Sequence, residues 1–133
     1  MSPTKRMALT SDELSAIMKI AGQMVIADGK IEANEDLLLK MALRYFIASD
    51  VDKGKSILLR SKEMNNSQAI ELISNLNEKQ KKFVFSFYTT IMLSDEDVNA
   101  NEMILLSFIT SVCKLPLMKP EDAVCYFKEA ITE

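Results

Sequence analysis

Histidine and tryptophan are absent from the sequence, and cysteine, glycine and proline are scarce, with two, three and three copies in 133 residues. Without histidine, a zinc site of the usual composition is not expected. No serine or cysteine stands in a recognisable nucleophile setting, and there is no glycine-rich phosphate loop. Six glycines and prolines in total are too few for the turns of a many-stranded β fold. The 48% hydrophobic content favours a compact helical protein.

Long apolar runs and an excess of positive charge are also missing. No stretch reaches transmembrane length, and the basic residues near the start are not followed by a signal-peptide core. The net charge of -3 and the pI near 5.1 remove the usual attraction to nucleic acid or an anionic membrane. Cys113 and Cys125 lack CxxC spacing, and we expect both to be buried and reduced rather than a disulfide pair. We therefore predict a cytoplasmic protein with no nucleic-acid partner and no membrane segment.

Negative charge is concentrated in two short connections, at residues 28–36 and 95–102. They carry net charges of -3 and -4, which leaves +4 on the rest of the chain. Apolar periodicity runs up to each connection and resumes after it, with the same order of acid, apolar residue, Ala-Asn and Glu in both. This repeat predicts two helix-turn-helix hairpins related by internal duplication.

Helix-start signals recur along the chain. Thr10 with Glu13 and Asn77 with Gln80 form capping-box patterns, and Pro120 suits a first helical position. With the apolar periodicity they predict seven helices and no strand, at residues 11–28, 35–47, 51–64, 68–76, 78–92, 100–114 and 120–131. The expected fold is an all-α bundle of about seven helices in one domain over residues 10–133, preceded by a flexible tail at residues 1–9.

The apolar pattern also predicts which helices are buried. The segments 35–47 and 100–114 are apolar almost all round, so we expect both to be core helices. We expect the short helix 68–76 to be an outlying element. In the helix 51–64, the packing residues should be Ile57, Leu58 and Leu59. At the start of the helix 78–92, a solvated basic face is predicted for Lys79, Lys81 and Lys82.

The second acidic connection partly matches a calcium-binding EF-hand loop. Asp95, Asp97 and Asn99 occupy its first three ligand positions. The sixth position is Ala100 where the turn needs glycine, and the twelfth is Leu106 where a bidentate carboxylate should stand. The sequence therefore argues against a true EF-hand.

A less specific metal site remains open. If the two turns converge, Asp28, Glu35, Asp95 and Glu102 offer oxygen ligands to one hard divalent cation such as calcium, magnesium or manganese. The alternative role is structural. In that case Asp28 and Asp95 hydrogen-bond the backbone of their own turns, and Glu35 and Glu102 cap the helices that follow.

The run from Ala27 to Ile31, the helix opened by Glu35 and the second copy at residues 95–102 resemble the TerB-like tellurite-resistance family. That family shares its domain with the amino-terminal region of a membrane-anchored DnaJ-like co-chaperone. The similarity spans roughly residues 14–115. It implies a seven-helix domain with internal duplication, a link to stress or tellurite resistance, and metal binding through acidic residues, but no established catalytic activity.

The match to the TerB-like pattern is specific only in the two acidic segments, at Asp28, Gly29, Glu35, Asp95 and Glu102. Glu96 replaces the second glycine, and Glu32 and Asn99 stand where aspartate is frequent. These departures bear on the geometry of the second turn and on any site shared between the turns.

Three functional classes follow from the sequence. We expect a non-enzymatic module that binds a divalent cation or a protein partner, including a second copy in a homodimer, through its acidic turns. The alternative is a scaffold with no metal site that works through the Lys-rich face or an apolar groove. A hydrolase that uses paired carboxylates is the third class, and paired acids alone give it little support.

Overall fold

The structure is a computed structural model that describes residues 9–27, 51–93 and 100–131. This part of the chain contains six helices and no strand: α2 (Ser11–Ala27), α4 (Val51–Glu63), α5 (Asn66–Ser74), α6 (Glu78–Leu93), α7 (Ala100–Cys113) and α8 (Pro120–Ile131). The all-α prediction is confirmed for this part. The predicted helix 35–47 and the tail up to residue 8 lie outside the described residues. Leu9, the last residue assigned to the tail, packs in the core with 7% exposure.

Capping side chains fix the helix starts where the sequence predicts them. The backbone N–H of Thr10 donates to Glu13 Oε1 at 2.8 Å, and the Glu13 N–H donates to Thr10 Oγ1 at 3.1 Å. Asn77 and Gln80 exchange the equivalent bonds at 3.0 and 2.8 Å before α6. Each box satisfies two backbone donors that a helix start leaves unpaired. Pro120 is the first residue of α8, as predicted.

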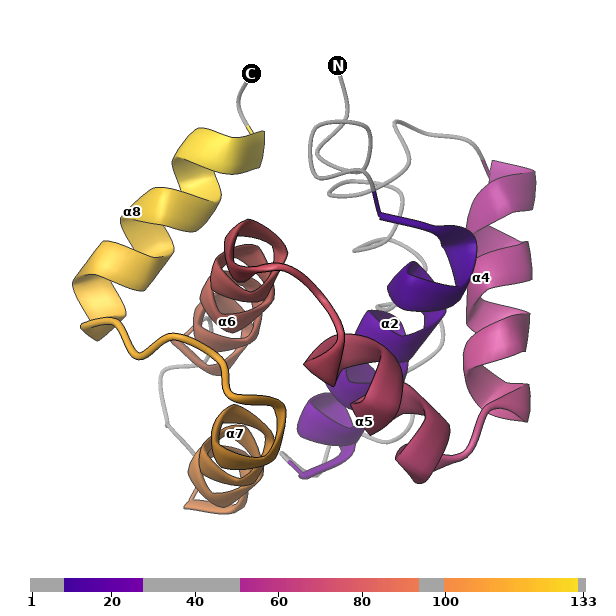
Figure 1. The fold of residues 1–133 in the computed structure, drawn as a ribbon, viewed down its shortest axis with the longest axis horizontal. Helices are drawn as coiled ribbons and strands as arrows, with labels where there is room; N and C mark the ends of the chain where they lie inside the picture. Colours follow the sequence, from indigo (N-terminus) through magenta and orange to yellow (C-terminus); the bar gives the residue numbers. More distant parts are fainter. Residues whose placement is uncertain (1–8, 28–50, 94–99, 132–133) are drawn as a thin grey trace.

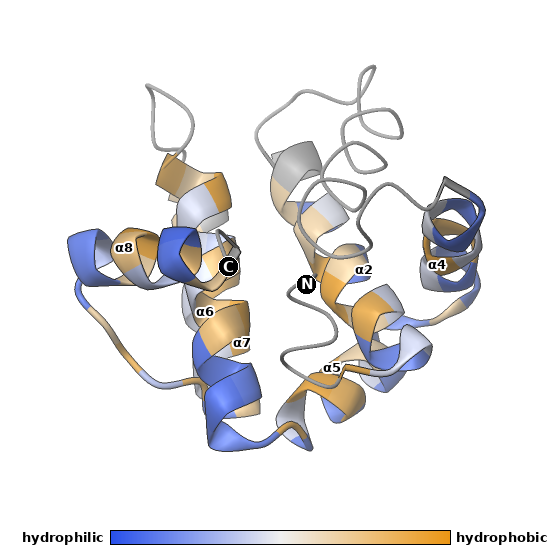
Figure 2. Cartoon of the chain, turned by 90° about the horizontal axis from the view of Figure 1, so that it is seen from above, coloured by the Kyte–Doolittle hydropathy of each residue, from blue (hydrophilic) through white to orange (hydrophobic). Residues whose placement is uncertain are grey.

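The six described helices form two groups, which are joined by α7 and by a direct contact between α2 and α6. Figure 1 shows α4 and α8 on opposite sides, with α2, α5 and α6 between them and α7 along one edge. The first group packs α2 against α4 and α5, the second packs α6 against α8, and α7 contacts α2, α5 and α6. Seen from above, hydrophobic residues run along α2, whereas the outer helix α4 is mostly hydrophilic (Figure 2).

Small and polar side chains join α2 to α4. The buried Ser15 hydroxyl donates to the Ile57 carbonyl oxygen at 3.1 Å. One turn further along α2, Lys19 Nζ donates to the Ser61 carbonyl oxygen at 3.2 Å. Ser61 lies in the last turn of α4, where unpaired carbonyls favour a cation. These bonds hold α4 in register on α2.

Only one face of α4 is buried, which corrects one prediction. Ile57 is 2% exposed, but Leu59 is 60% exposed. Residues two positions apart on a helix, such as Ile57 and Leu59, point in directions about 200° apart. Three consecutive apolar residues therefore cannot all face one neighbour. The prediction that Leu59 packs with Ile57 and Leu58 is therefore wrong.

The short helix α5 is central rather than outlying. It begins with a capping box in which the Gln68 N–H donates to Asn65 Oδ1 at 2.8 Å and the Asn65 N–H donates to Gln68 Oε1 at 2.9 Å. Ala69 and Ile73 are fully buried, and α5 contacts both α2 and α7. The prediction of an outlying element fails because α5 fills the space between these two longer helices.

Candidate functional site

The predicted metal ligands are largely outside the described part. Asp28, Glu35 and Asp95 lie outside the described residues. Glu102 lies in the first turn of α7, and its side chain is also outside them. Within residues 9–27, 51–93 and 100–131, no group of three or more Cys, Asp or Glu residues could hold a metal ion. The metal site and the convergence of the two turns stay predictions.

The predicted solvated basic face at the start of α6 is confirmed for two of its three lysines and is wrong for the third. Lys79 faces solvent, but Lys81 is only 8% exposed. Lys82 Nζ lies 4.5 Å from the centre of the Tyr126 ring on α8, a cation–π contact. Lys82 is nevertheless exposed, and it lies three residues from Lys79 on the same side of α6, so only Lys81 departs from the predicted solvated face.

The helix α6 is the centre of the described core. Ten of its residues are buried: Gln80, Lys81, Phe83, Val84, Phe85, Ser86, Phe87, Tyr88, Thr89 and Met92. On one side, the Phe83 and Phe87 rings each lie 5.6 Å from the Phe127 ring of α8. Tilted rings at this distance attract each other beyond their burial alone. These contacts fasten α8 to α6.

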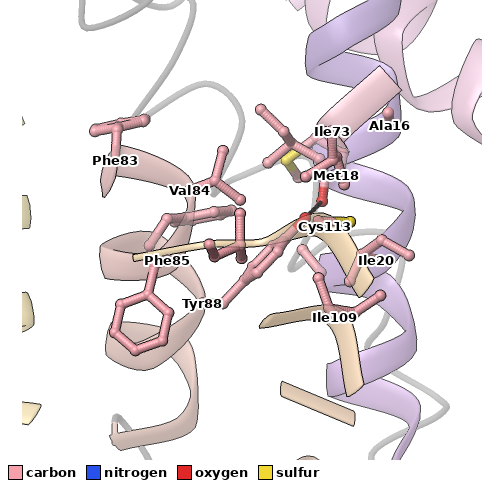
Figure 3. Close-up of a cluster of buried hydrophobic side chains, with 14 of the residues drawn as sticks. Ala16, Met18, Ile20, Ile73, Phe83, Val84, Phe85, Tyr88, Ile109 and Cys113 are labelled. Atoms are coloured by element: carbon pink, nitrogen blue, oxygen red, sulfur yellow. Dashed lines mark hydrogen bonds between the residues drawn. The ribbon is translucent and has the colours of Figure 1, made fainter. Parts of the chain in front are cut away.

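On its other side, α6 reaches α2 through a buried polar contact. The Tyr88 hydroxyl donates to the Ile17 carbonyl oxygen at 2.9 Å. Figure 3 shows the Tyr88 ring extending from α6 toward Met18, with Cys113 of α7 beside it. The Cys113 thiol in turn lies 3.6 Å from the Ile70 carbonyl oxygen of α5. A phenol and a thiol thus join four helices at their common junction.

Burial sets the chemistry of this junction. It raises the pKa of Tyr88 well above its usual value, and the nearby Cys113 raises it further. Burial also raises the pKa of the Cys113 thiol, against smaller lowering effects of Ser74 and Lys81. Both groups are therefore protonated at neutral pH and shielded from solvent, which suits packing rather than nucleophilic attack. Both cysteines are free, but Cys125 is exposed, so its predicted burial is wrong.

The helix α7 turns a row of large apolar side chains toward solvent. Met103, Ile104, Phe108 and Val112 are 52%, 66%, 52% and 43% exposed. Ile104, Phe108 and Val112 are spaced by four and form one stripe along the helix. The opposite side is buried through Leu106, Ile109 and Cys113. Among the described residues, the prediction of a fully buried core helix is wrong, because the contacts of α7 with α2, α5 and α6 cover one side and the four apolar side chains on the other are exposed.

This α7 face, defined as Met103, Ile104, Phe108 and Val112, is a large apolar patch without charge. With fully exposed areas of roughly 150–200 Å² per side chain, the four exposed fractions amount to roughly 400 Å². That is comparable to the largest apolar patch of a typical monomeric protein, which is often functional. No charged residue occurs from Met103 to Cys113. The face is therefore the best candidate for a functional surface in the described part.

The sequence contained a signal for this surface. A helix that is apolar all round must be covered on every side to be buried, and a domain of this size has few helices to provide cover. Ile104, Phe108 and Val112 were assigned to the core by their periodicity, and Met103 was not singled out. The absence of charge over three turns marked the helix, but it did not show which side lacks a neighbour.

The chain is similar to a solved protein of the same size. A crystal structure of the protein of unknown function PG1108 from Porphyromonas gingivalis W83 matches it with 36% sequence identity and a TM-score of 0.74, covering 90% of each chain. This chain belongs to the family of that protein. The Porphyromonas relative shares the overall fold of this chain, and it is described as a protein of unknown function.

Two further comparisons gave nothing: no family model matches the chain, and neither does any curated protein. In the described ranges, no helix is long and apolar enough to cross a membrane. Function must therefore be inferred from surface chemistry, and the α7 face is the feature on which that inference depends.

Proposed function

We propose that this protein is a non-enzymatic interaction module that binds a protein partner through the α7 face. The observation that carries the proposal is the 43–66% exposure of four large apolar side chains on α7, within the charge-free run from Met103 to Cys113. When a partner covers this exposed apolar area, its removal from water stabilises the complex by roughly 25 cal/mol per Å².

The way α7 is held supports a binding role. Its inner side is fixed by Leu106, Ile109 and Cys113, so the outer stripe lies on a preformed helix rather than on a loop. A preformed surface loses little conformational entropy on binding, and helix faces with anchors at four-residue spacing are a recurring recognition mode. By contrast, the buried Tyr88 and Cys113 are protonated and inaccessible, which supports packing rather than catalysis.

Selection of phage-displayed random peptides of about 16 residues, or four helical turns, tests this function. Peptides selected on the full chain should bind with Kd values of roughly 1–100 μM. Phe108→Glu, which puts a charge in the middle of the stripe, should weaken that binding at least tenfold.

Leu59→Glu is the matched control, because Leu59 is an equally exposed apolar residue on α4, away from the α7 face. It should leave peptide binding unchanged. If binding survives Phe108→Glu, or if no peptide is selected and the chain does not associate with itself either, the α7 face is not an interaction site.

The acidic turns support a second candidate function. The repeated order of acid, apolar residue, Ala-Asn and Glu favours a TerB-like domain with a seventh helix, an internal duplication and a role in stress or tellurite resistance. In that proposal Asp28, Glu35, Asp95 and Glu102 hold calcium, magnesium or manganese.

Calorimetric titration of each cation into the wild type and into the Asp28→Asn, Asp95→Asn double variant tests this second candidate. The wild type should release or absorb heat and melt at a higher temperature with metal, and the double variant should do neither. No heat and no melting shift at millimolar metal would rule the site out.

A further inference from the structure

We infer that the partner of the α7 face is a second copy of this chain, bound face to face about a two-fold axis. The inference rests on the proposed function of the α7 face and adds the identity of the partner. Three properties of the described residues support it: the charge of the face, its area and its shape.

The charge of the α7 face suits contact with itself. A two-fold axis places the same patch of both copies together, so a charged side chain near the axis would meet its like. None occurs from Met103 to Cys113. The exposed polar residues beside the stripe are Ser107 and Ser111, whose hydroxyls both donate and accept and can therefore pair with their own copies.

Other exposed helix surfaces do not share this property. The outer residues of α4 include Lys55 and Glu63, and those of α8 include Asp122 and Lys128. A two-fold contact through either helix would have to bring charges near the axis and remove them from water. The charge-free run of α6 from Phe83 to Leu93 is as long as that of α7 from Met103 to Cys113, but most of it is buried, whereas the run on α7 includes the exposed stripe.

The area is in the range that a specific dimer needs. Protein interfaces that form reversibly are about 57% apolar, so roughly 400 Å² of apolar surface corresponds to roughly 700 Å² per copy. Two copies would then bury roughly 1,400 Å² in total. Stable interfaces bury about 1,200–2,000 Å², and contacts without biological meaning are usually below about 800 Å².

The shape provides a ridge and a groove. Ile104, Phe108 and Val112 form a raised row at four-residue spacing, and the parallel row that begins at Met103 is low at Ser107 and Ser111 because serine is small. The ridge of one copy fits the groove of the other when two such helices cross at about -50° with axes 8–10 Å apart. Phe108 is the middle residue of the ridge, so the axis passes near it.

Sedimentation equilibrium of the full chain from about 1 to about 500 μM tests the inference, since a contact of this size gives Kd values in the micromolar range. A reductant is required, because the exposed Cys125 thiol could otherwise link copies covalently. The wild type should change from monomer to dimer with concentration. Phe108→Glu should weaken association at least 30-fold while its circular dichroism and unfolding transition show a folded chain, and Leu59→Glu should associate like the wild type.

A charge-swap pair makes the test specific to the two-fold contact. Phe108→Glu and Phe108→Lys should each be monomeric alone, and their equimolar mixture should form a heterodimer, because the axis brings position 108 of both copies together. Rescue of this kind cannot come from a folding defect.

The outcomes separate this inference from the function on which it rests. A wild type that stays monomeric at every concentration overturns the homodimer, and so does a dimer that Phe108→Glu leaves intact. If such a monomer still binds selected peptides in a Phe108-dependent way, the interaction module stands and its partner is a different protein. If it binds neither itself nor peptides, both proposals are wrong.

Discussion

In the consecutive helices α6 and α7, burial is the opposite of what the amino-acid compositions suggest. α6 begins with Glu-Lys-Gln-Lys-Lys, yet ten of its residues are buried, including Lys81. α7 carries no charge from Met103 to Cys113, yet four of its large apolar side chains face solvent. The neighbours explain the difference, because α8 covers α6 on one side and α2 and α7 cover it on the other. Within residues 9–27, 51–93 and 100–131, the neighbours of α7 cover one side of it, so burial depends on where neighbours lie around a helix.

The strongest test of this difference between α6 and α7 is to replace one phenylalanine in each helix by alanine. Phe87 is 1% exposed and its ring packs on Phe127 and Tyr88, so Phe87→Ala should cost about 3–5 kcal/mol. Phe108 is 52% exposed, so Phe108→Ala should change stability by no more than about 0.5 kcal/mol. Urea unfolding at a concentration where the chain is monomeric measures both. Equal losses would mean that α7 is buried like α6.

Local signals made much of the fold predictable from the sequence. The caps at Thr10 and Asn77 and the proline at position 120 act within four residues of a helix start, so no tertiary information is needed to read them. All six described helices were predicted as helices.

What the sequence did not predict depends on contacts between distant segments. Leu59, Phe108 and Cys125 are apolar and fit a helical period, which predicts a core position, but each is exposed because it lies on the side of its helix away from the described neighbours. Lys81 was assigned to the surface by its charge, although its long stem can be buried while its head lies among polar groups. The candidate surface was therefore visible as a charge-free helix but not as an exposed one, and the acidic turns remain predictions.

A second prediction concerns the bond that joins α6 to α2. Tyr88→Phe removes the 2.9 Å hydrogen bond to the Ile17 carbonyl oxygen and should cost about 0.5–1.5 kcal/mol near pH 7. That carbonyl keeps its helical partner, so the loss should stay well below that of Phe87→Ala. A loss as large as that of Phe87→Ala would show that the bond is not a local contact.

The same variant should change how stability depends on pH. The pKa of Tyr88 is raised above 10.0, its ordinary value, so above pH 10 the unfolded chain loses a proton that the folded chain keeps. Stability from this group is complete below pH 10 and is lost as pH rises toward the folded-state pKa, by up to about 1.4 kcal/mol per pH unit. Cys113, with its raised pKa, contributes the same sign from pH 9 upward in both proteins. The difference between the wild-type and Tyr88→Phe profiles therefore isolates Tyr88, and parallel profiles would contradict its burial.

The smallest expected effect concerns the turn that ends α7. This turn helps to hold the helix in place and is separate from the exposed α7 face. Lys114 follows the last residue of α7 with a φ of 57°, in the left-handed region, and the Leu115 N–H donates to the Thr110 carbonyl oxygen at 3.0 Å. This is the Schellman geometry in which glycine is favoured. Lys114→Gly should therefore stabilise the protein by about 0.5–1 kcal/mol, because glycine has no Cβ to strain that conformation.

Lys128→Gly is the matched control, because Lys128 is an exposed lysine inside α8, where glycine should cost about 0.8–1.0 kcal/mol. Urea unfolding should thus give opposite signs for the same chemical change, and equal signs would contradict the turn geometry at Lys114. The C-terminal turn of α7 lies beyond the stripe of Ile104, Phe108 and Val112. Lys114→Gly should therefore raise stability while leaving self-association at its wild-type strength, because the residues that anchor the helix differ from those that a second copy would cover.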